Sequence, residues 1–425
     1  MFWILPLLAG ASLAGLWLRE MHLRRTYETL CAEGRALLCE AKYALALERF
    51  DDAYRTAARV RLGFEDERVE SALYIAETLD KLGESSAALE AAESAMSLAQ
   101  QHDRNAPYRM RLFTLMADLS EKNGLGHRAI GLRQTAVALY RETFGVRSPR
   151  LAEQLQKLAG ALELGGLPGH AAKAYQEACK ITEESPDCRE THAACMAGLG
   201  HILVQMGDAD AAETTLKAAL ALQRDIYGDR DEHTAQTLAE LAALYGETGH
   251  YDDAVRCFEE AYRVQSRLYG PNDARVGLIL SSYAGCLRKA GRLDGATDAA
   301  TRAVKLLEMH AHPALANSLG NLGAVLMAGG DYHKALDAFE RADAALISAP
   351  SSVSPLDTAQ RLEDHADTLD HLQRALEAER LRSGAASIRS TLASVPPAEQ
   401  LLDPAADRPE SPSTLHKRPQ PHKSS

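Results

Sequence analysis

The sequence predicts an all-α protein, a solenoid of about nine helix-turn-helix repeats. Aromatic residues make up only 5% of the 425 residues and charged residues 25%, and Ala, Leu, Glu and Arg outnumber the strand-forming residues. In addition, a short segment with small residues at fixed places recurs about every 42 residues along most of the chain. Together these two observations favour stacked helical hairpins over a sheet-containing fold.

The chain begins with an apolar run, "FWILPLLAGASLAGLWL" at residues 2–18, followed by Arg19, Arg24 and Arg25. As a helix this run would span about 25 Å, slightly less than the ~30 Å hydrocarbon core of a membrane. The positive charges follow the run, whereas a cleaved signal peptide carries them before it. Residues 1–25 are therefore predicted to be a single-pass membrane anchor or an uncleaved signal. The flanking arginines place the rest of the chain in the cytosol or another reducing compartment.

The clearest copy of the repeat is "GHYDDAVRCFEEA" at residues 249–261. With Gly249 as the origin, small residues occupy three columns: Ala five and twelve residues after each origin, and Gly or Ala seven residues before it. The column nine residues after the origin, here named the knob column, usually holds a larger residue such as Phe258 or Phe339. The nine origins are Ala41, Gly83, Gly124, Gly166, Gly207, Gly249, Gly291, Gly330 and Gln373.

These columns have a direct physical meaning. Small residues on facing surfaces let two antiparallel helices approach closely, with ridges packed into grooves. The origin then lies in the turn between the helices, where glycine adopts a left-handed backbone without strain. The residue of the knob column is predicted to fill the space toward the next repeat. The charged residues of the 249–261 segment lie on the outer, solvated face.

The pattern resembles the tetratricopeptide repeat (TPR), in the 42-residue form of the kinesin light chains. The residues that carry the resemblance, and that pack the repeats, are Gly249, Ala254, Phe258, Ala261, Gly330, Ala335, Phe339 and Ala342. The stretch "IYGDRDEHTAQTLAELAALYGETGHYDDA" at residues 226–254 has the same rhythm. The resemblance covers residues 26–390 and implies a right-handed superhelical solenoid with a concave, protein-binding groove.

The last repeat and the tail differ from the rest. The copy that starts at Gln373 lacks the glycine and has Arg382 in the knob column, which is typical of a polar capping repeat. Residues 391–425 are rich in proline and show no apolar periodicity, so they are predicted to form a disordered tail.

The sequence argues against several functions. A net charge of −12 disfavours nucleic acid as a partner. No nucleophile-elbow, phosphate-loop, dinucleotide-binding or zinc-protease motif occurs, so neither an enzyme, a cofactor nor a small-molecule substrate is predicted. Cys188, His192 and Cys195 fall on one helical face, but no fourth ligand is near and a metal site is not predicted. The seven cysteines form no CxxC pair, which fits reduced thiols.

By the family's pattern, groove positions lie thirteen, ten, six, three and two residues before each origin. Repeats two to four place acidic residues there, whereas repeats five to eight offer small or neutral residues with a few polar ones. This division suggests an extended or helical ligand with a basic end over the acidic repeats and an apolar end over the later ones, although the charges could also be merely solvating. The candidate residues are Glu77, Asp80, Asp118, Glu121, Glu163, Arg288, Lys289, Asn317 and Asn321.

The leading functional hypothesis is a membrane-anchored TPR scaffold or adaptor that binds other proteins or peptides in its groove and organises a complex. The bacterial inner membrane and a mitochondrial membrane are both consistent with it. Two alternatives remain open: a peptide-sensing regulatory protein, and an assembly factor for a mitochondrial respiratory complex. The identity of the partner lies beyond the sequence.

Overall fold

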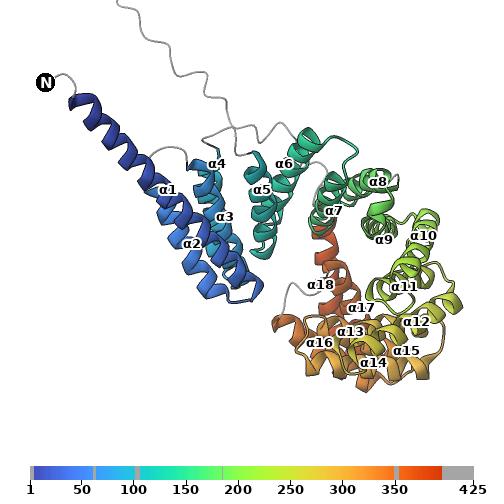
Figure 1. Ribbon diagram of the computed structural model, residues 1–425. Coiled ribbons are helices and arrows are strands. Elements are labelled where there is room, and N and C mark those ends of the chain that lie inside the picture. Colours follow the sequence, from blue (N-terminus) through green and yellow to red (C-terminus); the bar gives the residue numbers. More distant parts are fainter. Residues whose placement is uncertain (1–3, 61–63, 101–105, 184, 349–353, 395–425) are drawn as a thin grey trace, which may run out of the picture. The chain divides into compact units, whose positions relative to one another are not determined.

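The computed structural model describes residues 4–60, 64–100, 106–183, 185–348 and 354–394. In these residues the protein is all-α, without strands (Figure 1). The chain divides into two compact units, Met1–Leu244 and Tyr245–Ser425. The elements are α1 (Ile4–Cys39), α2 (Tyr43–Ala58), α3 (Glu65–Lys81), α4 (Ser85–Ala99), α5 (Ala106–Lys122), α6 (Gly126–Phe144), α7 (Pro149–Leu164), α8 (Pro168–Glu183), the short 3₁₀ helix η2 (Pro186–Cys188), α9 (Arg189–Gln205), α10 (Ala209–Tyr227), α11 (Glu232–Glu247), α12 (Tyr251–Tyr269), α13 (Ala274–Lys289), α14 (Leu293–Met309), α15 (Leu315–Ala328), α16 (Tyr332–Ser348), α17 (Pro355–His371) and α18 (Ala375–Ser394).

The helices follow one another as hairpins, each made of an odd-numbered first helix and an even-numbered second helix. The first helix packs on the second in the pairs α1–α2, α3–α4, α5–α6, α7–α8, α9–α10, α13–α14, α15–α16 and α17–α18. The second helix also contacts the next first helix in the pairs α2–α3, α4–α5, α6–α7, α8–α9, α12–α13, α14–α15 and α16–α17. This is the stacked-hairpin architecture that the repeat predicts.

The predicted turn position is confirmed at all nine origins. Each origin has a left-handed backbone, with φ between +55° at Ala41 and +85° at Gly83, including the two origins that are not glycine. At Gly249 the next amide, of His250, donates a 2.8 Å hydrogen bond to the carbonyl of Tyr245 and so closes the end of α11. The turn between the two helices therefore requires a left-handed backbone whatever the residue, and glycine is the residue that adopts it with the least strain.

The small columns form the interface within each hairpin. All eighteen alanines five and twelve residues after the origins are at most 1% exposed. The column before the origin holds glycine in three repeats, and in each of these the knob residue leaves no room for a side chain there, whereas the repeats of Tyr175 and Phe258 have alanine in this column. A Cβ added at Gly34, Gly200 or Gly323 would lie 2.5–2.7 Å from the side chain of Phe50, Leu216 or Phe339, respectively. The knob thus packs against its own first helix, a contact that the sequence pattern did not reveal.

The knob also reaches the next repeat, as predicted. The ring of Phe50 stacks on Tyr74 at 4.8 Å, and Phe339 stacks on His365 at 5.4 Å. Phe258 packs on Tyr283 at 5.9 Å. One side chain therefore holds the two helices of a hairpin together and joins that hairpin to the following one.

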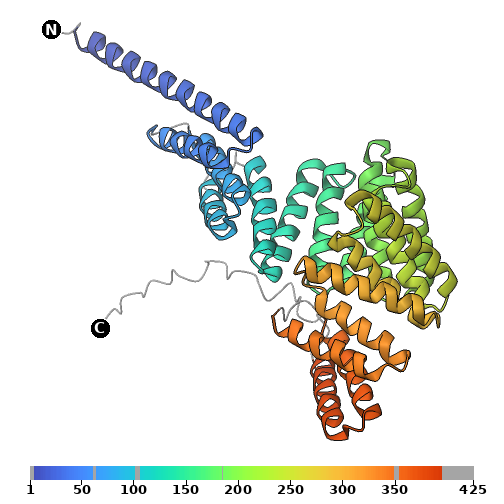
Figure 2. The same cartoon turned by 90° about the horizontal axis from the view of Figure 1, so that it is seen from below.

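The two ends of the chain differ in detail from the predicted boundaries. α1 is a continuous helix of 36 residues, so the predicted anchor and the first helix of repeat one are not separated at residue 25 (dark blue in Figure 2). Within the described part of the chain, no helix combines the length and apolarity needed to cross a membrane. At the other end, α18 continues to Ser394, and the remainder of the predicted tail lies outside the described residues.

Replacing single glycines by alanine tests the division between hinge and helix. At Gly249 (φ +83°) and at Gly285, inside α13, an added Cβ meets nothing within 4 Å. Gly249→Ala is expected to destabilise the protein by ~1–2 kcal/mol through backbone strain alone. Gly285→Ala is expected to stabilise it by ~0.5–1 kcal/mol, because alanine is the better helix former. Urea unfolding followed by circular dichroism should show midpoint shifts of opposite sign.

In the same series, Gly323→Ala should cost ~1–3 kcal/mol, because the new methyl group would overlap the ring of Phe339. The substitution Phe339→Leu makes room for that methyl group. The double variant should therefore lose less unfolding free energy than the sum of the losses in the two single variants. Strict additivity would contradict this packing.

Candidate functional site

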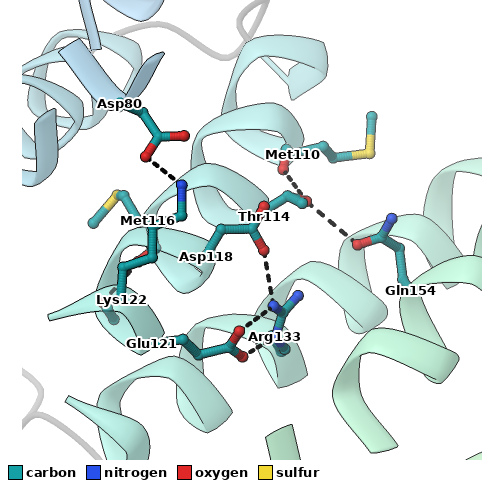
Figure 3. Close-up of polar contacts among 10 residues, drawn as sticks. Asp80, Met110, Thr114, Met116, Asp118, Glu121, Lys122, Arg133 and Gln154 are labelled. Carbon is teal, nitrogen blue, oxygen red and sulfur yellow. Dashed lines mark hydrogen bonds and ion pairs between the residues drawn. The ribbon is translucent and has the colours of Figure 1, made fainter. Parts of the chain in front are cut away.

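Two of the predicted acidic groove residues, Asp118 and Glu121, converge on one arginine, as Figure 3 shows. Arg133 donates from Nη2 to Asp118 (2.8 Å) and from Nε and Nη2 to the two oxygens of Glu121 (2.7 and 2.9 Å). Its side chain is only 7% exposed. Arg133 comes from α6, nine residues after the origin Gly124, and therefore stands in the knob column. The two carboxylates neutralise a charge that the repeat buries.

The last repeat shows the same arrangement. Arg382, in the knob column of α18, donates to Asp367 (2.7 Å) and Asp370 (2.6 Å). These aspartates lie six and three residues before the origin Gln373, as Asp118 and Glu121 do before Gly124. An arginine in the knob column thus occurs with carboxylates at the same two groove positions in both repeats.

The other two acidic residues of repeats two and three are paired with the following repeat. Glu77 accepts a hydrogen bond from Arg111 (2.7 Å), and Asp80 accepts one from Lys122 (2.5 Å), which Figure 3 shows beside the Arg133 cluster. A basic ligand segment would have to compete with these internal cations. Binding of such a segment by Glu77, Asp80, Asp118 and Glu121 stays a prediction. It would cost the free energy of breaking or sharing the existing ion pairs.

The polar candidates of the second unit are spread along its first helices. The side-chain amide of Asn321, in α15, donates to Oγ of Ser281, in α13, at 3.0 Å. Asn317 and Lys289 are exposed, and Arg288 is half-buried. Burial raises the pKa of Asp364, in α17, and the charge of Arg288 is among the effects that oppose this rise. A role of these four residues in binding a partner stays a prediction.

In the first unit, the predicted groove positions border a pocket of about 290 Å³. Ala194, Ala197 and His201 lie thirteen, ten and six residues before Gly207, and Glu163 lies three residues before Gly166. The walls come from the first helices α7, α9 and α11 and the second helices α8 and α10. The other lining residues are Tyr175, Gly198, Gln223, His233, Gln236, Thr237 and Glu240.

His201 lies between two carboxylates in this pocket. Its Nε2 is 3.2 Å from Glu163 of α7, and its Nδ1 is 3.4 Å from Glu240 of α11. Hydrogen bonding to Glu163 and to Glu240 raises the pKa of His201 to about 10, although burial opposes the shift. The ring is therefore an imidazolium at neutral pH. The amide of Gln205 lies 2.8 Å from Nε2, and a protonated ring requires the oxygen of that amide to face it.

The floor of the pocket is tightly built. Gly198 leaves room for the ring of Tyr175, since a Cβ at Gly198 would lie 2.5 Å from that ring. Burial raises the pKa of Tyr175, which keeps its hydroxyl group protonated. Gln223 of α10 is 3% exposed, and its Oε1 has no hydrogen-bond partner among the described residues. Oε2 of Glu240 is also buried, and its contact with Nδ1 of His201 is long, at 3.4 Å.

Sequence reasoning found Glu163 but missed His201, Glu240, Gln223 and Tyr175 as parts of a site. His201 could have been found, because it stands six residues before its origin, in the same column as Glu77 and Asp118. The small or neutral groove of repeats five to eight stays a prediction, and His201 is a titratable residue in one of its columns that forms ion pairs with Glu163 and Glu240. Glu240 lies nine residues before Gly249, outside the columns that the family pattern assigns to the groove.

The sulfur-containing cluster behaves as a packing element. Cys188 and Cys195 are buried, and Nδ1 of His192 lies 2.9 Å from Oγ1 of Thr182. Over the described ranges, no group of three or more His, Cys, Asp and Glu side chains is arranged to hold a metal ion.

Comparison with known proteins agrees with this architecture. The tetratricopeptide-repeat family model matches residues 192–267, 251–309 and 278–346, which confirms the predicted repeat type over that segment. No curated protein matches the sequence.

Several solved structures resemble the chain. The apo form of RapI is 11% identical, with a TM-score of 0.64 over 86% of this chain and 98% of RapI. The apo form of the quorum sensor NprR from B. thuringiensis is 13% identical, with a TM-score of 0.61 over 85% of this chain and 98% of NprR. A putative kinesin light chain from Podosopora anserina with nearly identical TPR-like repeats is 20% identical, with a TM-score of 0.43 over 49% of this chain and 99% of its own. At these identities the likeness to RapI and NprR concerns the fold.

The His201 cluster predicts a pH dependence of stability. A pKa raised from 6.5 to about 10 stabilises the folded state fully below pH 6.5, and the gain disappears as the pH rises toward 10. The unfolding midpoint in urea should therefore fall between pH 7 and pH 10 more steeply in the unmodified protein than in the His201→Gln variant. His250→Gln, at an exposed histidine, is the matched control and should keep the steep slope. Equal slopes for all three proteins would contradict the assigned protonation state.

Proposed function

We propose that the protein is an interaction scaffold that binds an extended segment of a partner protein along the first helices of its repeats, and so organises a complex. The observation that carries this proposal is the pocket at α7, α9 and α11. Its lining residues Ala194, Ala197, His201 and Glu163 occupy the groove columns of the repeat, and together they form a concavity of about 290 Å³. Solenoids use such concave surfaces to hold extended ligands.

The match to the tetratricopeptide-repeat model supports an interaction function, because it includes most of the helices that build this pocket. A peptide-sensing regulator is the second candidate, and the similarity of fold to the quorum sensor NprR favours it. The two functions differ in the response to the ligand. A sensor changes the pitch of its solenoid on binding, whereas a scaffold keeps it, and small-angle X-ray scattering with and without the partner separates them.

Membrane attachment through residues 2–18 is part of the proposal, and the uncharged apolar run followed by three arginines supports it. In carbonate-washed membranes from expressing cells, the full chain should stay with the membrane, whereas a variant with Leu8→Lys and Leu13→Lys should be released. Release of the full chain by carbonate would overturn the anchor and leave the groove proposal intact.

Site-specific photo-crosslinking tests the scaffold. A benzoylphenylalanine at Ala197, in the pocket, should crosslink reproducibly to one partner that mass spectrometry identifies. The same residue at Ala218, which is exposed on the second helix α10, is the matched control and should not capture that partner. Capture of the same proteins from both positions, or from neither, would contradict binding in the groove.

A further inference from the structure

We propose that the pocket around His201 binds the guanidinium group of an arginine side chain of the partner segment, with Glu163, Glu240 and Gln223 as the recognising residues. This inference rests on the proposed function, since it names the chemistry by which the groove recognises its ligand. It goes beyond the acidic residues of repeats two and three, because their carboxylates already have arginine or lysine partners.

The buried acceptors of the pocket indicate a ligand that donates hydrogen bonds. Oε1 of Gln223 is buried and has no hydrogen bond in the described residues. Oε2 of Glu240 is also buried, and its contact with Nδ1 of His201 is long, at 3.4 Å. The side chain of Gln223 is also only 3% exposed, so it lies at the bottom of the pocket rather than on the open surface. A buried acceptor without a donor costs free energy, which a ligand with N–H groups recovers.

The charge balance indicates that the ligand is a cation. Glu163 and Glu240 carry two negative charges, and His201 supplies one positive charge between them. The other titratable groups at the pocket do not restore neutrality, since Tyr175 stays protonated and His233 faces Asp231 at 2.9 Å. The cluster therefore keeps an excess negative charge in a partly buried setting, where a cation gains more than it would on an open surface.

Shape favours guanidinium over ammonium. The acceptors come from α7, α10 and α11, and the planar guanidinium group with its five N–H donors can serve several of them at once. An ammonium group is a compact and strongly hydrated charge, which matches this spread less well. The ring of Tyr175 provides an aromatic surface in the lining, a common neighbour of arginine. About 290 Å³ suits one long side chain rather than a folded element.

Binding of a second cation changes the protonation of His201. The imidazolium is stabilised by Glu163 from α7 and Glu240 from α11, and Gln205 contacts it from its own helix. A guanidinium that shares these carboxylates repels the imidazolium and lowers its pKa. Arginine binding should therefore release a proton from His201, and it should strengthen as the pH rises from 7 toward 10.

The experiment uses the full chain with 13Cε1-labelled histidine and small probes in place of the unidentified partner. Nα-acetyl-arginine methylamide is titrated against Nα-acetyl-citrulline methylamide, its uncharged counterpart, and Nα-acetyl-lysine methylamide. The His201 resonance, assigned by its loss in His201→Gln, should shift saturably with the arginine probe toward the neutral imidazole position. The dissociation constant should be at least tenfold lower for arginine than for citrulline, and lower than for lysine.

Three variants separate recognition from folding. Glu240→Gln and Glu163→Gln should each weaken binding of the arginine probe at least tenfold. Gln223→Met removes the buried acceptor without a change of charge and should weaken it at least threefold. Glu142→Gln, at an exposed carboxylate of the second helix α6 and outside the groove columns, should leave binding unchanged. Equal binding of the arginine and citrulline probes, or unchanged binding in Glu240→Gln and Gln223→Met with an intact circular dichroism spectrum, would overturn the proposal.

The outcomes also distinguish this inference from the proposed function. If the arginine probe binds but no partner is crosslinked at Ala197, the guanidinium site is supported and the scaffold function is overturned. If a partner is crosslinked but the arginine and citrulline probes bind equally, the scaffold function is supported and the guanidinium site is overturned.

Discussion

The close contact between the two helices of each hairpin is the constraint on which the rest of the structure depends. The second helix has fully buried alanines at two columns, the first helix has a buried glycine or alanine at one column, and a left-handed hinge joins the two helices. This contact fixes one face of every first helix and leaves the opposite face outside the packing. The residues on that free face can differ from repeat to repeat, and they supply the first-helix part of the His201 pocket, such as His201 and Glu240.

The packing face and the groove are nevertheless coupled through the knob column. The knob Phe339 requires glycine at position 323 of the first helix, because a Cβ there would overlap its ring, whereas the repeat of Phe258 accepts alanine at the equivalent position. An arginine knob requires negative charge instead, and Arg133 obtains it from Asp118 and Glu121 at groove positions. Part of the acidity of the groove therefore belongs to the interior of the repeat. A charged groove column alone is weak evidence for a charged ligand.

The sequence predicted the hinges and small columns in full, even at Ala41 and Gln373, because these residues recur at one position in each repeat. The site was predicted only at Glu163. His201 and Glu240 lie in different repeats and at different distances from their origins, so comparison of equivalent positions does not bring them together. Their proximity follows from how neighbouring first helices pack. Whether Oε1 of Gln223 finds a hydrogen-bond donor likewise depends on which side chains lie near it in the fold, and the repeat pattern of the sequence does not predict this.

The nature of the internal cation explains why the His201 pocket, rather than the acidic groove of repeats two and three, is suited to a basic ligand. The guanidinium groups of Arg111 and Arg133 stay charged, and Lys122 is paired with Asp80, so a basic ligand must displace or share an existing ion pair. His201 instead bridges the carboxylates of Glu163 and Glu240 as an imidazolium, and under the proposal it loses its proton when the cation of a ligand binds. The carboxylates then change partner without either becoming an unpaired buried charge. A histidine at this point stabilises the free protein and still permits exchange for a ligand.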